Sequence, residues 1–410
     1  MDTVNSGDTA WVLISTALVM LMTPGLALFY GGLVRRKNVL STIMHSFFML
    51  GLVSVTWVLW GYSLAFAPDA GLGLIGGLDW VGLEGVTGAP SDVYAPTVPH
   101  LAFMAFQMMF AIITPALITG AFAERKRFKA FVLFSVMWST FVYAPIAHWV
   151  WAPDGWLAGL GILDFAGGTV VHLASGVAAL VAALVVGRRL GLVRPATEPH
   201  DVPMTVLGAG LLWFGWFGFN AGSALGANGV AATALVTTNT AAAMAALTWV
   251  TISWLHRGTP SVIGAAIGAV AGLVAITPAA GFVTPAAAVL IGFGVSVVCY
   301  GASLLRLRSR VDDALDVFAV HGVGGAFGAI ATGVFATTAV NAAGRDGLLA
   351  GSAGQLLVQL AGAGAVAVYS ALMTAGILAL VNLLVRIRVP DEAENAGLDL
   401  AQHGEVAYGA

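Results

Sequence analysis

Residues 164–187 read DFAGGTVVHLASGVAALVAALVVG, and this stretch decides the class of fold. After Asp164 it contains no Asp, Glu, Lys or Arg until Arg188, so it supplies the about 20 apolar residues that a transmembrane helix needs. It also places one ionisable side chain, His172, inside the apolar run. The stretch therefore predicts a membrane-spanning helix with a titratable group in its interior.

The rest of the chain has the same character. Of its 410 residues, 59% are hydrophobic and 9% are charged, and the mean hydropathy is +0.91. Soluble domains carry roughly 25% charged residues, so this composition predicts an integral membrane protein. It excludes a soluble enzyme, a nucleic-acid binder and a disordered scaffold. The single cysteine, Cys299, excludes a disulfide framework and a cysteine-based metal site.

Charged residues and Pro- or Asn-rich breaks divide the chain into apolar runs, and each run is read as a transmembrane helix. No Lys or Arg precedes the first run, so we expect a retained span there rather than a cleaved signal. The eighth run is short. The eleven predicted spans are 10–34, 40–66, 99–122, 128–150, 165–187, 202–222, 229–255, 261–277, 284–305, 318–336 and 350–386.

The basic residues between these spans indicate the orientation. Of the 17 Lys and Arg residues, only Arg345 falls on one side of the membrane. The others share the opposite side: Arg35, Arg36, Lys37, Arg125, Lys126, Arg127, Lys129, Arg188, Arg189, Arg194, Arg257, Arg306, Arg308, Arg310, Arg386 and Arg388. Because cytoplasmic loops are rich in Lys and Arg, the N-terminus is predicted outside and the C-terminus in the cytoplasm.

The first ten spans divide into two sets of five, at about 10–187 and 202–336. Because each set has an odd number of spans, the second set crosses the membrane in the opposite direction to the first. Asp164 precedes His172 by eight residues in the fifth span, and Asp313 precedes His321 by eight in the tenth. Eight helical residues rise about 12 Å, so descents from opposite faces of a roughly 30 Å core leave the histidines about 6 Å apart in depth. The sequence therefore predicts an inverted repeat whose two histidines meet near the midplane.

An ionisable group inside a membrane is costly, so two histidines at one depth favour a functional role over simple packing. A zinc site is not expected, because no third His or Cys ligand lies near either histidine. No cofactor motif or nucleophile accompanies them. We therefore predict neither a cofactor nor an enzyme.

Several motifs resemble those of the ammonium transporter family, and the likeness covers nearly the whole chain. The stretch from Asp164 to His172 is similar to the family signature. The other motifs are MTPG at 22–25, LFYGGL at 28–33, RKNV at 36–39, GYSLAF at 61–66, WFGFNAGS at 216–223 and DVFAVHG at 316–322. The resemblance implies an all-α protomer with eleven spans, a homotrimer, and one conduction path through each subunit.

The resemblance also implies which residues form that path. The outer ammonium site is formed by Phe106, Trp151 and Ser223, and the gate of two stacked phenyl rings by Phe110 and Phe219. The two pore histidines are His172 and His321, and the essential aspartate is Asp164. The loop that follows Trp151 is a residue longer than the family pattern. This leaves Trp156 as the alternative to Trp151 at the outer site.

These residue types suit a cation that can lose a proton. Ammonium and potassium have the same charge and similar sizes, but only ammonium donates directional hydrogen bonds and can be deprotonated. The Ser223 hydroxyl can accept one N–H, and the faces of Trp151 and Phe106 can attract the cation by about 1–2 kcal/mol. We therefore expect ammonia to pass the gate and the histidines, while the proton follows its own route and makes transport electrogenic.

Three alternative functions and two roles for Asp164 stay open at this point. A Rhesus-type channel would pass ammonia or carbon dioxide electroneutrally, an ammonium sensor would bind without conducting, and a membrane enzyme would use the two histidines. Asp164 is either a helix cap with an electrostatic role, which we favour, or the proton acceptor.

The segment 390–410 is acidic, and by composition it is a solvated cytoplasmic tail that follows a transmembrane domain at 1–389. The resemblance implies instead that this tail packs under the trimer and couples its subunits. It also implies a PII-type signalling protein as a partner at the cytoplasmic face, and ammonium, ammonia or methylammonium as the substrate. The expected location is the cytoplasmic (inner) membrane, with the lipid bilayer around the protein and no nucleic-acid partner.

Overall fold

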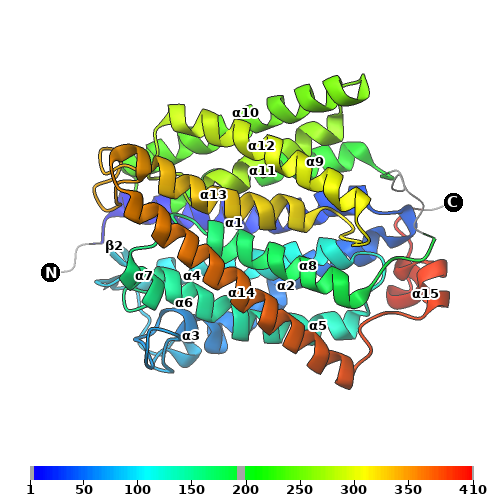
Figure 1. Ribbon diagram of the computed structural model, residues 1–410. Coiled ribbons are helices and arrows are strands. Elements are labelled where there is room, and N and C mark those ends of the chain that lie inside the picture. The colour runs from blue at the N-terminus through cyan, green and yellow to red at the C-terminus, as the bar shows by residue number, and fades with distance from the viewer. Residues whose placement is uncertain (1–3, 192–198, 409–410) are drawn as a thin grey trace.

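The computed structural model describes residues 4–191 and 199–408, and its regular structure is almost entirely helical (Figure 1). The α-helices are α1 (Ser6–Leu33), α2 (Val39–Thr56), α3 (Tyr62–Phe66), α4 (His100–Ile118), α5 (Phe128–Trp138), α6 (Ala144–Trp151), α7 (Trp156–Leu160), α8 (Ala174–Val186), α9 (Val202–Trp216), α10 (Gly229–Arg257), α11 (Val262–Ile276), α12 (Pro285–Arg308), α13 (Val323–Phe335), α14 (Ala353–Leu384) and α15 (Asp391–Ala396). Two short strands, β1 (Pro90–Ser91) and β2 (Ala95–Pro99), pair antiparallel before α4.

The helices account for the predicted membrane spans. Among the described residues, ten helical segments are long and apolar enough to cross a membrane, and the shorter apolar helix α11 is the eleventh. Their order matches the prediction, and α11 is the short eighth span. Some spans contain a π-helical turn, such as η6 (Gly168–Leu173), which leads into α8, and η8 (Phe318–Gly322), which leads into α13. The prediction of an all-α membrane protein is confirmed.

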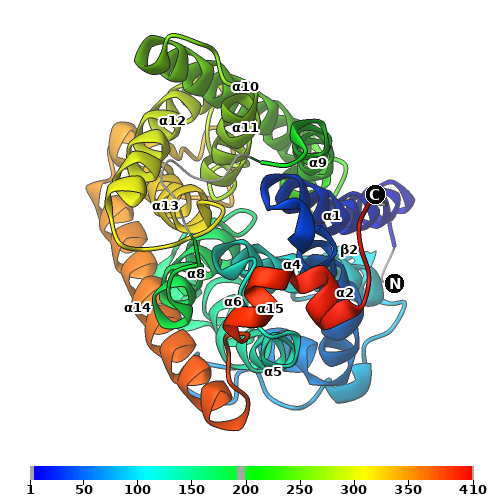
Figure 2. The same cartoon turned by 90° about the vertical axis from the view of Figure 1, so that its right-hand side faces the viewer.

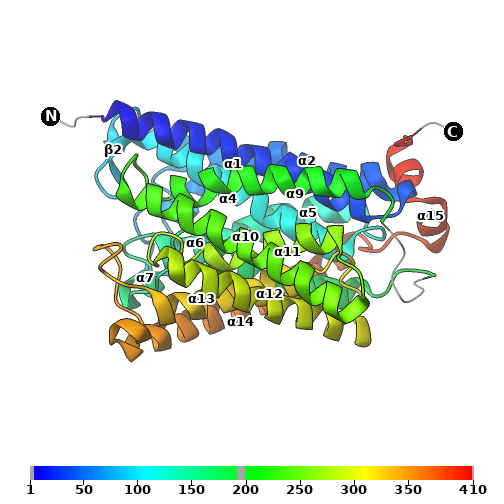
Figure 3. The ribbon, with the colours of Figure 1, turned by 90° about the horizontal axis from the view of Figure 1, so that it is seen from above.

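The start of α1 and the segment after α15 lie at opposite ends of the bundle, as an odd number of crossings requires (Figures 1 and 3). The basic loops meet the C-terminal segment at one end, where Lys126 and Arg388 form an antiparallel bridge. Arg194, which was counted among the basic residues of that side, lies outside the described residues. The assignment of this end to the cytoplasm stays a prediction.

Glycines allow helix backbones to approach closely where His172 and His321 lie. A Cβ atom added to Gly176 on α8 would lie 2.0 Å from the backbone nitrogen of Gly322, which directly follows His321. A Cβ atom added to Gly325 on α13 would lie 2.8 Å from the carbonyl oxygen of Gly168. Small residues of this kind let membrane helices pack closely, and here they hold the two histidine-bearing turns together.

Helix α14 runs obliquely across α13 and α8 on the outside of the bundle (Figures 1 and 2). Its buried Gln359 accepts a hydrogen bond from the Leu163 backbone N–H (2.7 Å) and donates one to the Leu163 carbonyl oxygen (2.8 Å). A buried backbone group without a partner is costly, so this glutamine replaces the partners that a helix would supply. It fixes the chain immediately before Asp164.

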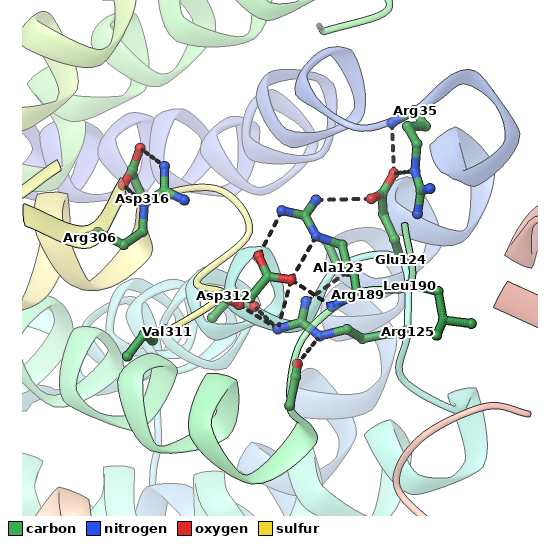
Figure 4. A network of polar contacts seen from close by, with 12 residues as sticks. Arg35, Ala123, Glu124, Arg125, Arg189, Leu190, Arg306, Val311, Asp312 and Asp316 are labelled. Carbon is green, nitrogen blue, oxygen red and sulfur yellow. Dashed lines mark hydrogen bonds and ion pairs between the residues drawn. The ribbon is translucent and has the colours of Figure 1, made fainter. Parts of the chain in front are cut away.

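A buried ionic network ties the loops together at the C-terminal end (Figure 4). Glu124 accepts hydrogen bonds from Arg35 (3.0 Å) and Arg189 (2.9 Å). Asp312 accepts two from the Arg189 guanidinium (3.0 and 2.8 Å) and lies 4.0 Å from that of Arg125. Burial alone would raise the pKa of both carboxyl groups, but the neighbouring guanidinium charges lower each pKa to about 2. The four segments that contribute these residues are thereby held in one arrangement.

The acidic segment after α14 packs across the ends of the helices (Figure 2). The Asp399 carboxylate accepts hydrogen bonds from the backbone N–H groups of Leu40 (3.0 Å) and Ser41 (2.8 Å), which lie in the first turn of α2. Gln402 accepts from the Phe128 N–H (2.8 Å) and donates to the Lys126 carbonyl oxygen (3.1 Å). The solvated tail expected from composition is therefore wrong for this segment, because its side chains complete open backbone groups of the loops.

Candidate functional site

A cavity of about 200 Å³ opens at the N-terminal end of the bundle. Its wall combines aromatic rings with a few polar groups: Phe66, Val93, Tyr94, Phe103, Gln107, Phe110, Trp151, Pro153, Phe165, Ser223 and Leu225. The predicted residues Trp151, Ser223 and Phe110 therefore meet in one place although they come from three different spans. The mixture suits a small cation, because aromatic faces attract positive charge and polar oxygens accept N–H groups.

The orientation of Ser223 follows from the bonds it makes. Its hydroxyl donates to the Phe219 carbonyl oxygen (2.9 Å), so the hydroxyl proton is engaged within the helix. A hydroxyl oxygen has two acceptor lone pairs besides its single donor. Ser223 therefore faces the cavity as a hydrogen-bond acceptor, which is the role that an N–H cation requires.

Trp151, and not the alternative Trp156, lies in the cavity wall. The Trp151 indole N–H donates to the carbonyl oxygen of Asp164 (3.0 Å), and its ring meets the Phe110 ring edge-on at 5.9 Å. Trp156 packs against Trp149, with ring centroids 5.6 Å apart. Because the donor of Trp151 is occupied, its ring can offer the cavity only π-electron density and not a hydrogen-bond donor.

Helix α4 contributes a different set of side chains from the one expected. Phe106 is 0% exposed, and its ring packs edge-on against Phe110 at 4.9 Å. Phe103, Gln107 and Phe110 form the wall instead, at the i, i+4, i+7 spacing of one helix face. The side-chain oxygen of Gln107 is buried and has no partner within the described part of the chain. Sequence reasoning missed Phe103 and Gln107, although this helical spacing from Phe110 points to both.

Two phenyl rings close the inner end of the cavity. The rings of Phe110 and Phe219 lie 4.3 Å apart with an interplanar angle of 35°. Both side chains are fully buried. Phe219 lies in the π-helical turn η7 (Phe217–Ala221), where an extra residue in the turn changes the direction of the side chains. The predicted pair of rings therefore separates the outer cavity from the interior.

The two histidines meet directly behind these rings. The Nδ1 atoms of His172 and His321 are 3.3 Å apart, and the His172 ring stacks on Phe219 at 5.8 Å. The prediction that the two histidines meet is confirmed. One Nδ1 must donate and the other must accept, so two neutral rings take opposite tautomers. One Nε2 atom is then a donor and the other an acceptor.

The path past the histidines consists of small chambers. One of about 10 Å³ is lined by Met22, Leu26, Phe29, Ile113, Leu117, His172, Leu212, Trp216, Val270 and His321. A second of about 10 Å³ follows it and shares Phe29, Val270 and His321 with the first. A volume of this size holds about one water molecule. The chambers therefore suit a neutral molecule of that size and exclude a hydrated ion.

Asp164 lies behind the outer cavity and is saturated with hydrogen bonds. Its two oxygens accept from the backbone N–H groups of Gly167 (2.9 Å), Gly168 (2.6 Å), Thr169 (2.8 Å) and Val170 (3.1 Å), and from the Thr169 hydroxyl. These donors are the first groups of the turn that bears His172, which have no partners within the helix. Asp164 therefore caps this turn, and its carbonyl oxygen orients Trp151.

These features define a class of protein: a multi-pass membrane protein with a cation-suited cavity at its N-terminal end, a two-ring closure and small chambers behind it within the same chain. The Ammonium Transporter Family model matches residues 10–408. The chain is 54% identical to an ammonium transporter of Bacillus subtilis over 98% of both chains. Among solved structures, Mep2 of Saccharomyces cerevisiae has a TM-score of 0.90 at 39% identity, covering 95% of this chain and 89% of Mep2. A sensor Amt protein has a TM-score of 0.87 at 30% identity, covering 97% and 98%. The chain belongs to the ammonium transporter family.

Proposed function

We propose that this protein transports ammonium across the cytoplasmic membrane by passing ammonia through its interior. One observation carries the proposal: the Phe110 and Phe219 rings, 4.3 Å apart, divide a cation-suited cavity from chambers of about 10 Å³. A site for a cation thus opens onto a path for a neutral molecule. The substrate must change its protonation state between the two.

The outer cavity selects ammonium by its shape and its acceptors. The π-faces of Trp151 and Phe110 attract a cation by about 1–2 kcal/mol when it is partly desolvated. The oxygens of Ser223 and Gln107 accept its N–H groups. Phe106 acts from behind by supporting Phe110. Methylammonium has the same donors and is a second expected substrate.

Deprotonation makes passage possible. Moving a bare cation into apolar surroundings costs several kcal/mol even after relaxation, whereas ammonia avoids most of this cost. Beyond the rings, the donor and acceptor Nε2 atoms of His172 and His321 provide hydrogen bonds that match those of ammonia. The histidines also relay the separated proton, so transport carries charge. Potassium has no proton to lose and is excluded.

The test is the current across liposomes that contain the purified protein on a solid-supported membrane. An ammonium pulse is expected to give a transient current and a matched potassium pulse none. The His172→Ala/His321→Ala double variant should lose the current, whereas His256→Ala, which changes a histidine outside the path, should keep it. Absence of current with fast alkalinisation of the lumen would establish a Rhesus-type neutral channel. Neither signal, with ammonium binding retained, would establish a sensor like the Amt protein of similar fold.

The assembly and its regulation follow from the family resemblance. Three copies form a homotrimer with one path in each subunit, the N-terminus is outside, and the basic end faces the cytoplasm. The packed tail then lies where a PII-type signalling protein would meet the transporter. Native mass spectrometry tests the trimer, and a pull-down with and without residues 390–408 tests the partner.

A further inference from the structure

The path below the histidines widens at one carboxylate. The chamber beneath His321 and an inner cavity of about 300 Å³ have two residues in common, Ile267 and Asp316. Among the described residues that line either space, Asp316 is the only acidic one. Any molecule that leaves the chamber for the inner cavity therefore passes this side chain.

Asp316 is held in place by an arginine from the neighbouring helix. Its two oxygens accept from Nε (2.5 Å) and Nη2 (3.1 Å) of Arg306 near the end of α12 (Figure 4). Its backbone adopts φ = 59°, a conformation that is uncommon for a residue other than glycine. Such backbone conformations persist where the surrounding structure imposes them, and they concentrate at functional sites. The carboxylate is thus fixed at the junction of the two spaces.

The surroundings of the Asp316 carboxylate favour replacement of Arg306 by another cation. Burial raises the pKa of Asp316, and the Arg306 charge offsets only part of that effect. The inner cavity is large enough for water and bears a second basic residue, Arg257. A small cation that reaches Asp316 therefore meets two carboxylate oxygens that are already paired with Arg306. Beyond them lies a cavity large enough to hold water.

We infer that Asp316 is an inner ammonium site and that Arg306 is the resident cation with which ammonium competes. This inference rests on the proposed function. Ammonia leaving the chamber takes a proton from a hydronium ion in the inner cavity: one N–H bond forms, one O–H bond breaks, and water remains. The new ammonium binds the carboxylate in place of the guanidinium. Arg306 then returns and releases it.

This arrangement gives the two ends of the path different properties. The outer site holds ammonium with rings and neutral oxygens, whereas the inner site uses a full negative charge that is already paired. Arg306 keeps the inner site weak for ammonium, so the product leaves. The same guanidinium opposes cations that enter from the cytoplasmic side. The pair therefore makes ammonium binding weaker at the inner end than at the outer end.

The test compares the two sides of the membrane in the intact protein. Ammonium currents are recorded from patches of giant liposomes in which the protein has one orientation, and the half-saturating concentration is measured from each side. Asp316→Asn is expected to raise the cytoplasmic value on the order of tenfold, because charged hydrogen bonds are lost. Arg306→Gln is expected to lower it by a similar factor. Both variants should leave the outer value unchanged, and Arg308→Gln, an exposed charge removed from the same helix, should change neither.

The outcomes separate this inference from the proposed function. Equal shifts on both sides, or no cytoplasmic shift in either variant, would overturn the inner site while leaving ammonium transport established. Loss of all current in the unmodified protein would instead contradict the proposed function. Because Asp316→Asn and Arg306→Gln are expected to shift the value in opposite directions, a general loss of folding cannot imitate the result. The unchanged outer value is a further control within each variant.

Discussion

The two ends of the path begin with the same short motif but treat its carboxylate differently. Asp164 lies eight residues before His172, and Asp313 lies eight residues before His321; each histidine belongs to a π-helical turn. Asp164 accepts five hydrogen bonds. Asp313 accepts from the neighbouring backbone N–H groups of Phe318 (2.7 Å) and Val317, and its Oδ1 atom has no partner among the described residues. Equal spacing from a histidine thus does not imply a shared role: the first carboxylate is a saturated cap, and the second is a carboxyl group with unused capacity.

The surroundings of Asp164 and Asp313 also differ, because few charged groups lie near the first and many lie near the second. Near Asp164 the outer cavity is lined by rings and neutral polar groups. Near Asp313 the inner end contains the Arg306–Asp316 pair and the network of Glu124, Arg189 and Asp312. Burial, and then the charge of Asp316, raise the pKa of Asp313 to about 6. The outer end is therefore organised by hydrogen bonds to the backbone and the inner end by buried charge.

The largest effect is expected for Asp164→Asn. Both oxygens of Asp164 accept N–H groups, so the amide nitrogen of asparagine would face donors and leave several of them unpaired. Each buried donor without a partner costs about 1–3 kcal/mol, so the free energy of unfolding should fall by about 4 kcal/mol and transport should be lost. Thermal unfolding in detergent and the ammonium current measure the two effects. An Asp164→Asn protein with normal stability and current would show that Asp164 is not the cap described here.

The inner network predicts the next largest effect. Glu124→Gln removes the charge that pairs with Arg35 and Arg189 and leaves a buried guanidinium short of a partner. Breaking a buried pair on one side costs about 3 kcal/mol. The pKa of Glu124 is about 2, below its ordinary value of 4.5, so this stability is present above pH 4.5 and is lost as the pH falls toward 2. Unfolding curves from pH 7 to pH 3 should converge for the two proteins, and parallel curves would contradict the assignment.

Asp313→Asn is expected to act in the opposite direction and to be smaller. Because the folded pKa of about 6 exceeds the ordinary 3.8, the folded protein loses stability as the pH rises from 3.8 to 6. Asparagine can still accept from the Phe318 N–H, and it removes the ionisation. The variant should therefore be more stable by up to about 3 kcal/mol at pH 7.5 and nearly equal to the parent near pH 4. Melting temperatures of the parent and the variant at both pH values test this prediction. A variant less stable than the parent at pH 7.5 would mean that the ionised Asp313 carboxylate makes a stabilising interaction.

The smallest effect is expected for Thr169→Val. This change removes one hydroxyl donor from Asp164 and leaves the four backbone donors in place. The loss of one hydrogen bond costs about 1 kcal/mol, so the melting temperature should fall by a few degrees while the ammonium current persists. Loss of the current would indicate that the Thr169 hydroxyl does more than share in the cap.

Much of the fold was predictable because each membrane span is a continuous stretch of mostly apolar sequence. Each span is a largely apolar run of 17 to 37 residues, and each break contains charged residues, proline or asparagine. Even the short eighth span appears as the short helix α11. The meeting of His172 and His321 also followed from the helical rise and the motif spacing alone.

The site was less predictable where it depends on which face of a helix points inward. Phe106 carries a ring suited to the outer cavity, yet the cavity wall is formed by Phe103 and Gln107 of the same helix. Phe103 and Phe106 have the same side chain, so residue type alone does not choose between them, although the helical spacing from Phe110 favours Phe103 and Gln107. Only packing against the neighbouring helices decides the rotation.

The sequence by itself determined that this chain lies in a membrane, crosses it with eleven apolar helices and brings two histidines to one depth. Hydropathy and helical rise are properties of single segments, so no knowledge of the neighbours is needed. The tertiary structure alone decided that Asp164 is saturated while Asp313 is not, that Glu124, Arg189 and Asp312 share one network, and which groups the acidic tail packs against. Those facts depend on the distances between groups far apart in the chain, and small changes in these distances determine whether a buried charge is stabilised or left unpaired.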